Sequence, residues 1–401
     1  MSMKKPLFTQ IEGGKGFYSL LVLLGAFILA ALGSVYYMEH NGHWVTGMNN
    51  QIVWGMPHVF AIFLIVAASG ALNVASIGSV FGKKMYKPLA PLSGLLAIAL
   101  LVGGLMVLVL DLGRPDRLLV AMTHYNFKSI FAWNIILYNG FLAIVAVYLW
   151  TMMEKRMNRY TTVAGFAAFF WRLILTTGTG SIFGFLVARE AYNAALLAPM
   201  FVIMSFAFGL AFFMLVLFAI YKWSGRPLGD GVVQRLKNLL GVFIGAVLYF
   251  VLVYHLTNLY ITERHGVEAF ILRDGGIYTT LFWVGQIVIG SLLPLVLFYH
   301  PTLGKNRNLI GFGALLVILG GLAQLYVLLI GGQAYPLEIF SGYEVLHGFN
   351  EGMINSYTPT GWEISLGLGG VAFALALVAV AIKVLRFMPQ SLADDAVDVH
   401  H

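Results

Sequence analysis

The chain has 401 residues, of which 60% are hydrophobic and only 10% are charged. Soluble domains carry about 25% charged residues, so this chain cannot cover its surface with polar groups, and we expect a lipid bilayer to be its solvent. The absence of cysteine excludes disulfides, thiolate-bound zinc, cysteine-ligated iron–sulfur clusters and thioether-attached haem.

The hydropathy pattern predicts an all-α integral membrane protein with ten membrane-spanning helices. Each run of about 20 mostly apolar residues can cross a bilayer, and the runs lack the strict alternation over about 10 residues that a membrane β-barrel shows. The expected spans are 17–37, 52–81, 88–112, 129–153, 161–180, 196–223, 236–260, 276–300, 307–331 and 361–387.

We expect one membrane domain over residues 1–401, built from two four-helix bundles. The first bundle is predicted over 52–153, and the second within 161–331, which holds helices five to nine. Helices 17–37 and 361–387 are expected at the periphery. The short acidic tail after Arg386 is expected to be disordered.

Lysine and arginine predict the orientation of the helices. If the N-terminus is cytoplasmic, about 17 of the 24 basic residues fall on the cytoplasmic side and about six on the other side. Both termini are therefore predicted to be cytoplasmic. The net charge of +7 is then a topology signal, and it does not indicate nucleic-acid binding.

Residues 109–117 read V-L-D-L-G-R-P-D-R and end the third predicted helix on its outer side. Gly113 permits a left-handed stop, and Pro115 prevents the helix from continuing. An anion at a helix C-terminus is disfavoured by the helix dipole, so Asp111 needs a partner, which Arg114 or Arg117 can supply. This spacing alone leaves a polar rim and a functional site equally open.

Two histidines lie inside predicted spans, near the outer ends. His58 follows Trp54-Gly55-Met56-Pro57, and His255 lies in Y-H-L-T-N. An intramembrane histidine is a functional hypothesis, because imidazole exchanges a proton near neutral pH. A structural histidine bonded to a backbone carbonyl is the alternative, and a b-type haem held by both histidines is a third.

Other charged groups are less specific. Arg172 is expected in mid-helix, where a charge costs at least ~2.5 kcal/mol; it either supports the structure or forms a proton path with Thr176 and Thr177. On the outer side, charged residues are candidates for docking a partner: Arg117, Arg189, Glu190, Glu338 and Glu344.

The segment over about 52–135 resembles the NrfD/polysulfide-reductase-C family. The resemblance rests on D-L-G-R-P followed by H-Y-N-F-K-S-I-F-A-W, and on the Trp54-Gly55 start of the preceding helix; the matching positions are Asp111, Leu112, Gly113, Arg114, Pro115, Arg117, Asn126, Ser129 and Trp133. Ten helices are typical of the longer branch. The G-M-P-H-V-F-A-I-F and A-Y-P-L-E-I-F stretches are most similar to DsrP, the member associated with the sulfite-reductase Dsr complex.

The resemblance implies a quinone-reactive subunit of a respiratory or sulfur-metabolism oxidoreductase in the bacterial cytoplasmic membrane. It would exchange electrons between menaquinol or ubiquinol and a ferredoxin-like iron–sulfur subunit on the periplasmic side. Multihaem cytochrome c and further membrane subunits are other expected partners. We expect no haem, iron–sulfur cluster or metal in this chain. Whether protons also cross the membrane is left open.

The resemblance places the quinone site in the first bundle. His58 matches the histidine that contacts quinone, and Asp111 is the expected proton acceptor. Trp54, Arg114, Tyr125 and Asn126 complete the predicted site.

Two other functions stay open on the sequence alone. A secondary transporter would also have ten helices and an intramembrane arginine, but it would gather its polar groups at the membrane midplane, whereas here they gather at the outer end. A structural membrane anchor without quinone chemistry is the second alternative.

Overall fold

The structure is a computed structural model that describes residues 7–336 and 353–397. Within these ranges, ten helices are long and apolar enough to cross a membrane, which confirms the prediction. The spans are Lys15–Asn41, Met56–Ser79, Lys84–Leu110, Ile130–Met153, Asn158–Gly184, Leu197–Ser224, Asp230–Tyr260, Ile277–Tyr299, Arg307–Ala334 and Gly361–Val384.

Several spans consist of more than one helical element. The α-helices are α1 (Lys15–Asn41), α2 (Met56–Ala71), α3 (Asn73–Ser79), α4 (Ala90–Leu110), α5 (Leu118–Thr123), α6 (Ile130–Met153), α7 (Thr161–Gly184), α8 (Leu197–Ser224), α9 (Asp230–Tyr260), α10 (His265–Ala269), α11 (Ile277–Thr280), α12 (Leu293–Tyr299), α13 (Arg307–Tyr326), α14 (Gly332–Ala334) and α15 (Gly361–Val384). The π-helices are η6 (Phe270–Asp274), η7 (Leu281–Leu292) and η9 (Val327–Gly331).

The remaining elements are short. The 3₁₀ turns are η1 (His43–Val45), η2 (Lys84–Leu89), η3 (Pro115–Arg117), η4 (Asn158–Tyr160), η5 (Thr262–Arg264) and η8 (Leu303–Lys305). The strands are β1 (Phe8–Thr9) and β2 (Met388–Pro389).

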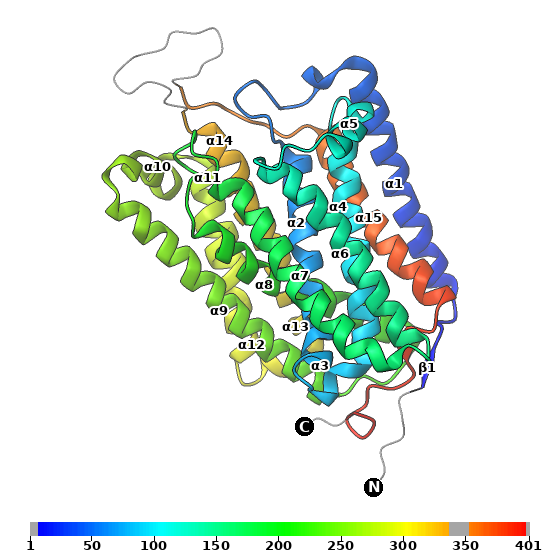
Figure 1. Ribbon diagram of the computed structural model, residues 1–401. Coiled ribbons are helices and arrows are strands. Elements are labelled where there is room, and N and C mark those ends of the chain that lie inside the picture. Colours follow the sequence, from blue (N-terminus) through cyan, green and yellow to red (C-terminus); the bar gives the residue numbers. More distant parts are fainter. Residues whose placement is uncertain (1–6, 337–352, 398–401) are drawn as a thin grey trace.

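The first bundle consists of α2 with α3, α4, α6 and α7 (Figure 1). The expected range 52–153 contains only three of the long helices, and the fourth helix packed with them is α7. This fourth helix lies beyond the short loop after residue 153, so the four helices together cover 56–184. The second bundle consists of α8, α9, the span from α11 to α12, and α13.

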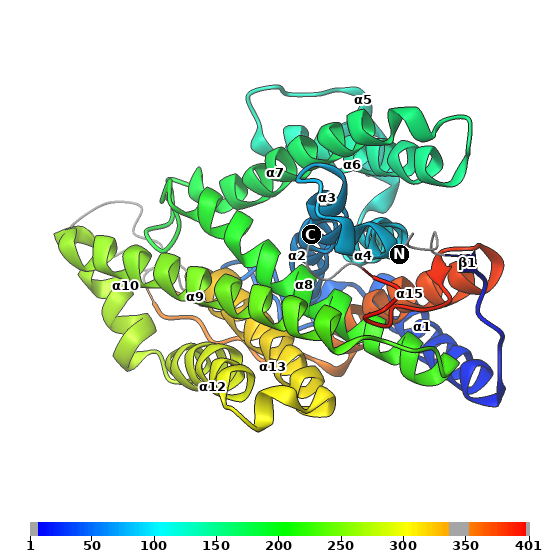
Figure 2. The same ribbon diagram turned by 90° about the horizontal axis from the view of Figure 1, so that it is seen from below.

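The two bundles meet where α2 packs against α8, and α13 also packs against α2. The span that contains α2 is the most enclosed of the ten, because nearly all of its residues are buried inside the protein. Helices α1 and α15 pack against each other and, through α15, against α4 and α2. Figure 2 shows this pair together on one side of the molecule.

The predicted helix 52–81 begins four residues later, at Met56, and is interrupted at Leu72. Ser93 of α4 is inserted at the interruption: its hydroxyl donates to the carbonyl of Ala71 at 2.7 Å and accepts from the amide of Ala75 at 3.0 Å. A side chain inserted into the helical hydrogen-bond ladder is a common cause of such a break. Sequence hydropathy does not detect it, because the residue that causes the break belongs to a different helix.

The described chain ends lie on the same face. Strand β1 pairs antiparallel with β2, with Phe8 opposite Pro389. Arg226 donates to the carbonyls of Met388, Pro389 and Gln10. The tail after Arg386 is thus ordered as far as Val397, and the expectation of disorder was wrong there, because backbone carbonyls of the tail satisfy a cation of the α8–α9 loop. We call the opposite face, which carries loops 42–55, 111–129, 185–196 and 261–276, the distal face.

A glycine on each side permits the close approach of α2 and α8. A Cβ atom at Gly209 would overlap the backbone of Gly70 and Ala71. Small residues at helix crossings are typical of membrane bundles, where close packing replaces the hydrophobic effect as the driving force.

We therefore expect Gly209→Ala to lower the free energy of unfolding by ~1–3 kcal/mol, the usual range for overpacking. Thermal unfolding of the purified protein in lipid nanodiscs measures the effect. The control is Gly245→Ala on α9, where a Cβ atom meets nothing within 4 Å; its stability should be unchanged or higher. Equal midpoints for the two variants would contradict the packing described here.

Candidate functional site

His58 and Asp111, which are 53 positions apart in the sequence, meet at the distal end of the first bundle. His58 lies in the first turn of α2, and Asp111 follows the last residue of α4. Nδ1 of His58 is 2.9 Å from Oδ2 of Asp111. The Asp111 side chain is fully buried, and that of His58 is 21% exposed. The structure therefore brings together the two residues predicted to be catalytic.

The pair is close but not aligned as a hydrogen bond. Neither Nδ1 of His58 nor either carboxylate oxygen of Asp111 has a hydrogen-bond partner among the residues that the structure describes. Burying a carboxylate without a donor is unfavourable, and such groups in native proteins have a specific reason. The arrangement is therefore a buried acceptor beside an accessible imidazole, which can receive and hold a proton.

Arg114 does not compensate Asp111, as we had expected it to. Its guanidinium makes a two-pronged contact with Asp116, with Nε and Nη2 each donating at 3.0 Å. The hydrogen bonds from Arg114 hold the pKa of Asp116 below its usual value. Both side chains are more than half exposed. The turn at Gly113, with φ of 64°, leads the chain away from Asp111. Arg114 therefore pairs with Asp116 and not with Asp111.

Tyr125 and Asn126 have no described contact with the His58–Asp111 pair. Tyr125 is half-buried against Phe127, with ring centroids 5.8 Å apart. Asn126 is exposed, and its side-chain oxygen accepts the amide of Lys128. Asn126 thus shapes the turn before α6, which is an ordinary role for asparagine.

Trp54 forms an aromatic wall beside His58. The ring centroids of Trp54 and His58 are 6.4 Å apart, and Trp54 also contacts Phe183 and Tyr192. Phe131, at the start of α6, lies 6.3 Å from Trp54 and is 47% exposed. Phe131 was not predicted from the sequence, because nothing distinguishes it from the many lipid-facing aromatics.

The chain that leads into α2 is held by the side-chain amide of Gln333 in α14. Its Oε1 accepts from the amides of Val53 at 2.9 Å and Trp54 at 3.0 Å, and its Nε2 donates to the carbonyls of Trp54 at 3.0 Å and Leu329 at 2.8 Å. Arg189 donates to the carbonyls of Gln333 and Gln51. These contacts link the second bundle to the site in the first.

A second clamp comes from the segment before α15. The hydroxyl of Tyr357 accepts from the amide of Met56 at 2.7 Å and donates to Glu363 at 2.6 Å. Burial, together with the Glu363 carboxylate, raises the pKa of Tyr357, so the hydroxyl remains a donor. Gly55 is required here, because a Cβ atom would lie 2.5 Å from Oε1 of Glu363. The capping box Thr360-x-x-Glu363 was the sequence signal for this clamp.

Arg172 is buried without an acid partner among the described residues. Its Nη2 donates to Asn73 at 2.9 Å, and its guanidinium lies 5.0 Å from each of the Phe169 and Phe206 rings. The hydroxyl of Thr176 donates to Ser69 at 2.6 Å. Arg172 thus stabilises the break between α2 and α3, because Asn73, the first residue of α3, accepts a hydrogen bond from its guanidinium.

The predicted proton path through this cluster stays a prediction. Ser69 lies eleven residues from His58 along α2, or about 16 Å, and the intervening residues of α2 are apolar. Thr177 is exposed on another face of α7 and does not join Arg172 and Thr176.

Three of the five predicted docking residues lie in the described part of the chain, and they differ in exposure. Arg189 is engaged inside the protein by two carbonyls and is therefore not available to a partner. Arg117 is exposed, and Glu190 is half-buried. Glu338 and Glu344 lie outside the described residues.

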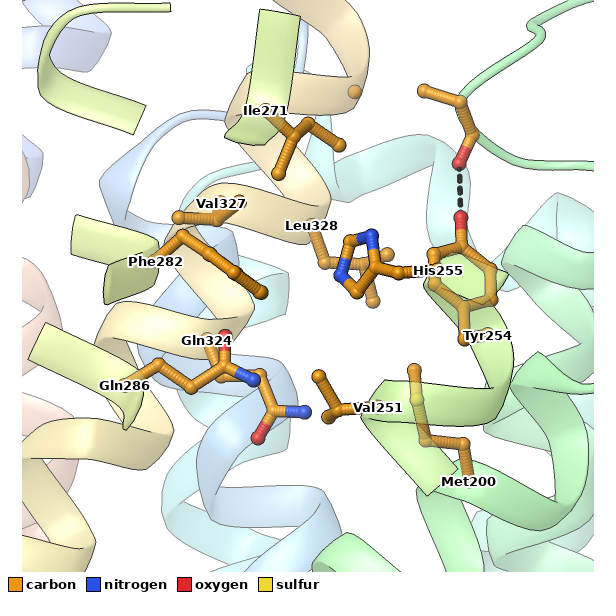
Figure 3. A pocket seen from close by; sticks show the side chains of 12 residues that line it. Met200, Val251, Tyr254, His255, Ile271, Phe282, Gln286, Gln324, Val327 and Leu328 are labelled. Atoms are coloured by element: carbon orange, nitrogen blue, oxygen red, sulfur yellow. Dashed lines mark hydrogen bonds between the residues drawn. The ribbon is translucent and has the colours of Figure 1, made fainter. Parts of the chain in front are cut away.

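His255 faces its own carboxylate in the second bundle. Its Nδ1 is 2.6 Å from Oε2 of Glu268. His58 and His255 therefore do not face one another, which argues against a haem held between them. The cavity drawn in Figure 3 also lies in the second bundle, beside His255, and not at His58.

Comparisons with known proteins agree with an integral membrane protein. Residues 44–336 match the family model described as polysulphide reductase, NrfD. The chain is 28% identical to the Hdr-like menaquinol oxidoreductase integral membrane subunit of Archaeoglobus fulgidus, over 98% of this chain and 99% of that protein. It is 23% identical to the menaquinone reductase integral membrane subunit of Nitratidesulfovibrio vulgaris, over 91% of each. It is 25% identical to the protein NrfD of Escherichia coli, over 71% of this chain and 96% of that protein.

If Gln333 positions the start of α2, Gln333→Leu should lower the free energy of unfolding by at least ~1 kcal/mol, because it leaves backbone groups of Val53 and Trp54 unpaired. Limited proteolysis should also cleave loop 42–55 faster. The control is Asn139→Leu, because Asn139 is exposed and bonds only within its own helix. The interpretation fails if both variants unfold and are cleaved alike.

Proposed function

Because the chain belongs to the polysulphide reductase NrfD family, we propose that it is the quinone-reactive membrane subunit of a multi-subunit oxidoreductase. Support comes from the full-length similarity to a protein named as a menaquinol oxidoreductase membrane subunit. We favour menaquinol or ubiquinol as the substrate. The assignment to the Dsr-complex branch stays a prediction, since none of the three relatives carries that name.

The observation that carries the proposal is the buried Asp111 carboxylate, which has no donor among the described residues, next to a partly exposed imidazole. Oxidation of a quinol releases two electrons and two protons, so the protein must offer a proton acceptor at the substrate oxygen. His58 is accessible for this role, while Asp111 is shielded from solvent behind it.

The distance between the two residues refines their roles. The two oxygens of a quinol lie on opposite sides of its ring, whereas Nδ1 of His58 and Oδ2 of Asp111 are 2.9 Å apart. An arrangement with His58 at one quinol oxygen and Asp111 at the other does not fit this distance. We propose instead that Nε2 of His58 accepts a proton from one quinol hydroxyl, and that Asp111 stabilises the resulting imidazolium.

Trp54 and Phe131 provide the apolar wall of the proposed site. Phe131 is half-exposed, so a quinol entering from the lipid would meet it before Trp54 and His58. Tyr125 and Asn126 stay the predicted further contacts of the quinol headgroup.

Electrons must leave to another subunit, because this cysteine-free chain cannot ligate an iron–sulfur cluster through cysteine. We propose a ferredoxin-like iron–sulfur partner on the distal face, with multihaem cytochrome c and further membrane subunits as additional members. The distribution of lysine and arginine supports cytoplasmic chain ends and a periplasmic distal face in a bacterial cytoplasmic membrane.

We expect His58→Ala to lower the rate of quinol oxidation by the assembled complex about 10²-fold or more, the usual contribution of a general base. Asp111→Asn should also lower kcat, because the imidazolium loses its counter-charge. Rates are measured with a soluble quinol analogue and an artificial electron acceptor.

The matched control is Arg114→Ala, which removes a charge of the same motif that pairs with Asp116 and should leave kcat nearly unchanged. A normal rate in His58→Ala would favour a structural anchor over a quinone-reactive subunit. Substrate uptake by the chain alone in liposomes would favour a secondary transporter.

A further inference from the structure

The second bundle contains a histidine–carboxylate pair that the proposed quinol chemistry does not use. Glu268 of α10 is fully buried, and its Oε2 lies 2.6 Å from Nδ1 of His255. At that distance a proton must lie between the two atoms, because two lone pairs would repel. The other oxygen, Oε1, accepts from Asn258 at 2.8 Å, and Asn258 in turn accepts from Arg264.

On its other side the His255 ring lines a small cavity of about 30 Å³. Figure 3 shows the side-chain amides of Gln286 and Gln324 reaching toward the same space from two other helices. Both glutamines are 5% exposed, and no described residue hydrogen-bonds their side-chain amides. One water molecule needs about 10–15 Å³ and two or more polar partners, so the cavity has room for about two waters and the groups to hold them.

The same two glutamines also line a second, smaller cavity of about 10 Å³ that reaches Ser291. Gln286 and Ser291 both belong to the π-helix η7, and the hydroxyl of Ser291 donates to the carbonyl of Gln286 at 3.0 Å. A π-helix is rare and frequently marks a functional site. Polar groups thus continue from His255 into the core of the second bundle.

We propose that His255, Glu268 and the hydrated cavity beneath them form a proton-exchange site in the second bundle. A proton passes from cavity water to Nε2 of His255, while Nδ1 keeps its own proton toward Glu268. The carboxylate neutralises the imidazolium. Only a proton moves, and nothing is oxidised or reduced.

Glu363 shows what a purely structural buried carboxylate looks like in the same protein. Its two oxygens accept from the hydroxyl of Tyr357, the amides of Gly47 and Thr360, and the hydroxyl of Thr360. All four donors are fixed protein groups. Glu268 differs because its contacts include an imidazole that opens onto a cavity with unpaired amides.

Other charged and titratable groups occur on the elements around the pair. They are Tyr254 on α9, Glu263 and Arg264 in η5, His265 in α10, Arg273 and Asp274 in η6, Arg189, Glu190 and Tyr192 before α8, Tyr278 in α11, and Tyr326 in α13.

The proposal is tested by the titration of the His255 ring nitrogens, followed by ¹⁵N nuclear magnetic resonance of the full chain in lipid bilayers. The chain has ten histidines, and His255→Gln identifies the signal. We expect Nδ1 to stay protonated while Nε2 titrates. Glu268→Gln should shift that titration toward lower pH by about 1–3 pH units, the usual effect of losing an adjacent opposite charge.

Gln286→Leu leaves the ion pair intact but removes a polar wall of the cavity, so it should also shift the titration toward lower pH. Asp274→Asn is the control, because this carboxylate is exposed and paired with Arg273; it should leave the titration unchanged. A His255 ring that does not titrate in the unaltered protein would overturn the proposal, as would a titration unaffected by Glu268→Gln. Neither readout depends on quinol oxidation.

Discussion

The position of the start of α2 depends on one buried amide. Gln333 makes four hydrogen bonds, and three of them fix the backbone of Val53 and Trp54. This irregular entry into a helix is held by donors and acceptors from elsewhere in the chain: the Gln333 amide binds Val53 and Trp54, and the Tyr357 hydroxyl accepts from Met56. The position of this segment determines where Trp54 and His58 lie. A residue of the second bundle, Gln333, thus helps to determine the geometry of the site in the first bundle.

The sequence predicted the number of helices well, because a run of about 20 apolar residues is rare outside a membrane span. It also paired His58 with the neighbourhood of Asp111. It could not predict where Arg114 points, since Asp116 and Asp111 are equally plausible partners in sequence. The break at Leu72 was missed for a related reason: its cause is Ser93, a residue of a different helix. The local turn decides the first detail and a contact between helices decides the second, and hydropathy carries no information about either.

Buried polar groups in the described part of the chain fall into two kinds. Glu363 and Gln333 are saturated by fixed protein groups and hold backbone in place. The Asp111 carboxylate is enclosed but lacks a hydrogen-bond partner within that part, and the side chains of Gln286 and Gln324 are buried beside cavities. The first kind resembles the polar networks that specify a unique fold. Groups of the second kind can bind a substrate, water or a proton. The first bundle contains such a group at Asp111, and the second contains two at Gln286 and Gln324.

The groups that hold the start of α2 come from the far end of the chain. Gln333, Tyr357 and Glu363 lie at the end of the ninth long helix or beyond it, whereas α2 is the second long helix to be made. During synthesis the N-terminal parts emerge first, so α2 enters the bilayer before its partners exist. A partly synthesised or truncated subunit therefore lacks the contacts that hold the start of α2 and position Trp54 and His58.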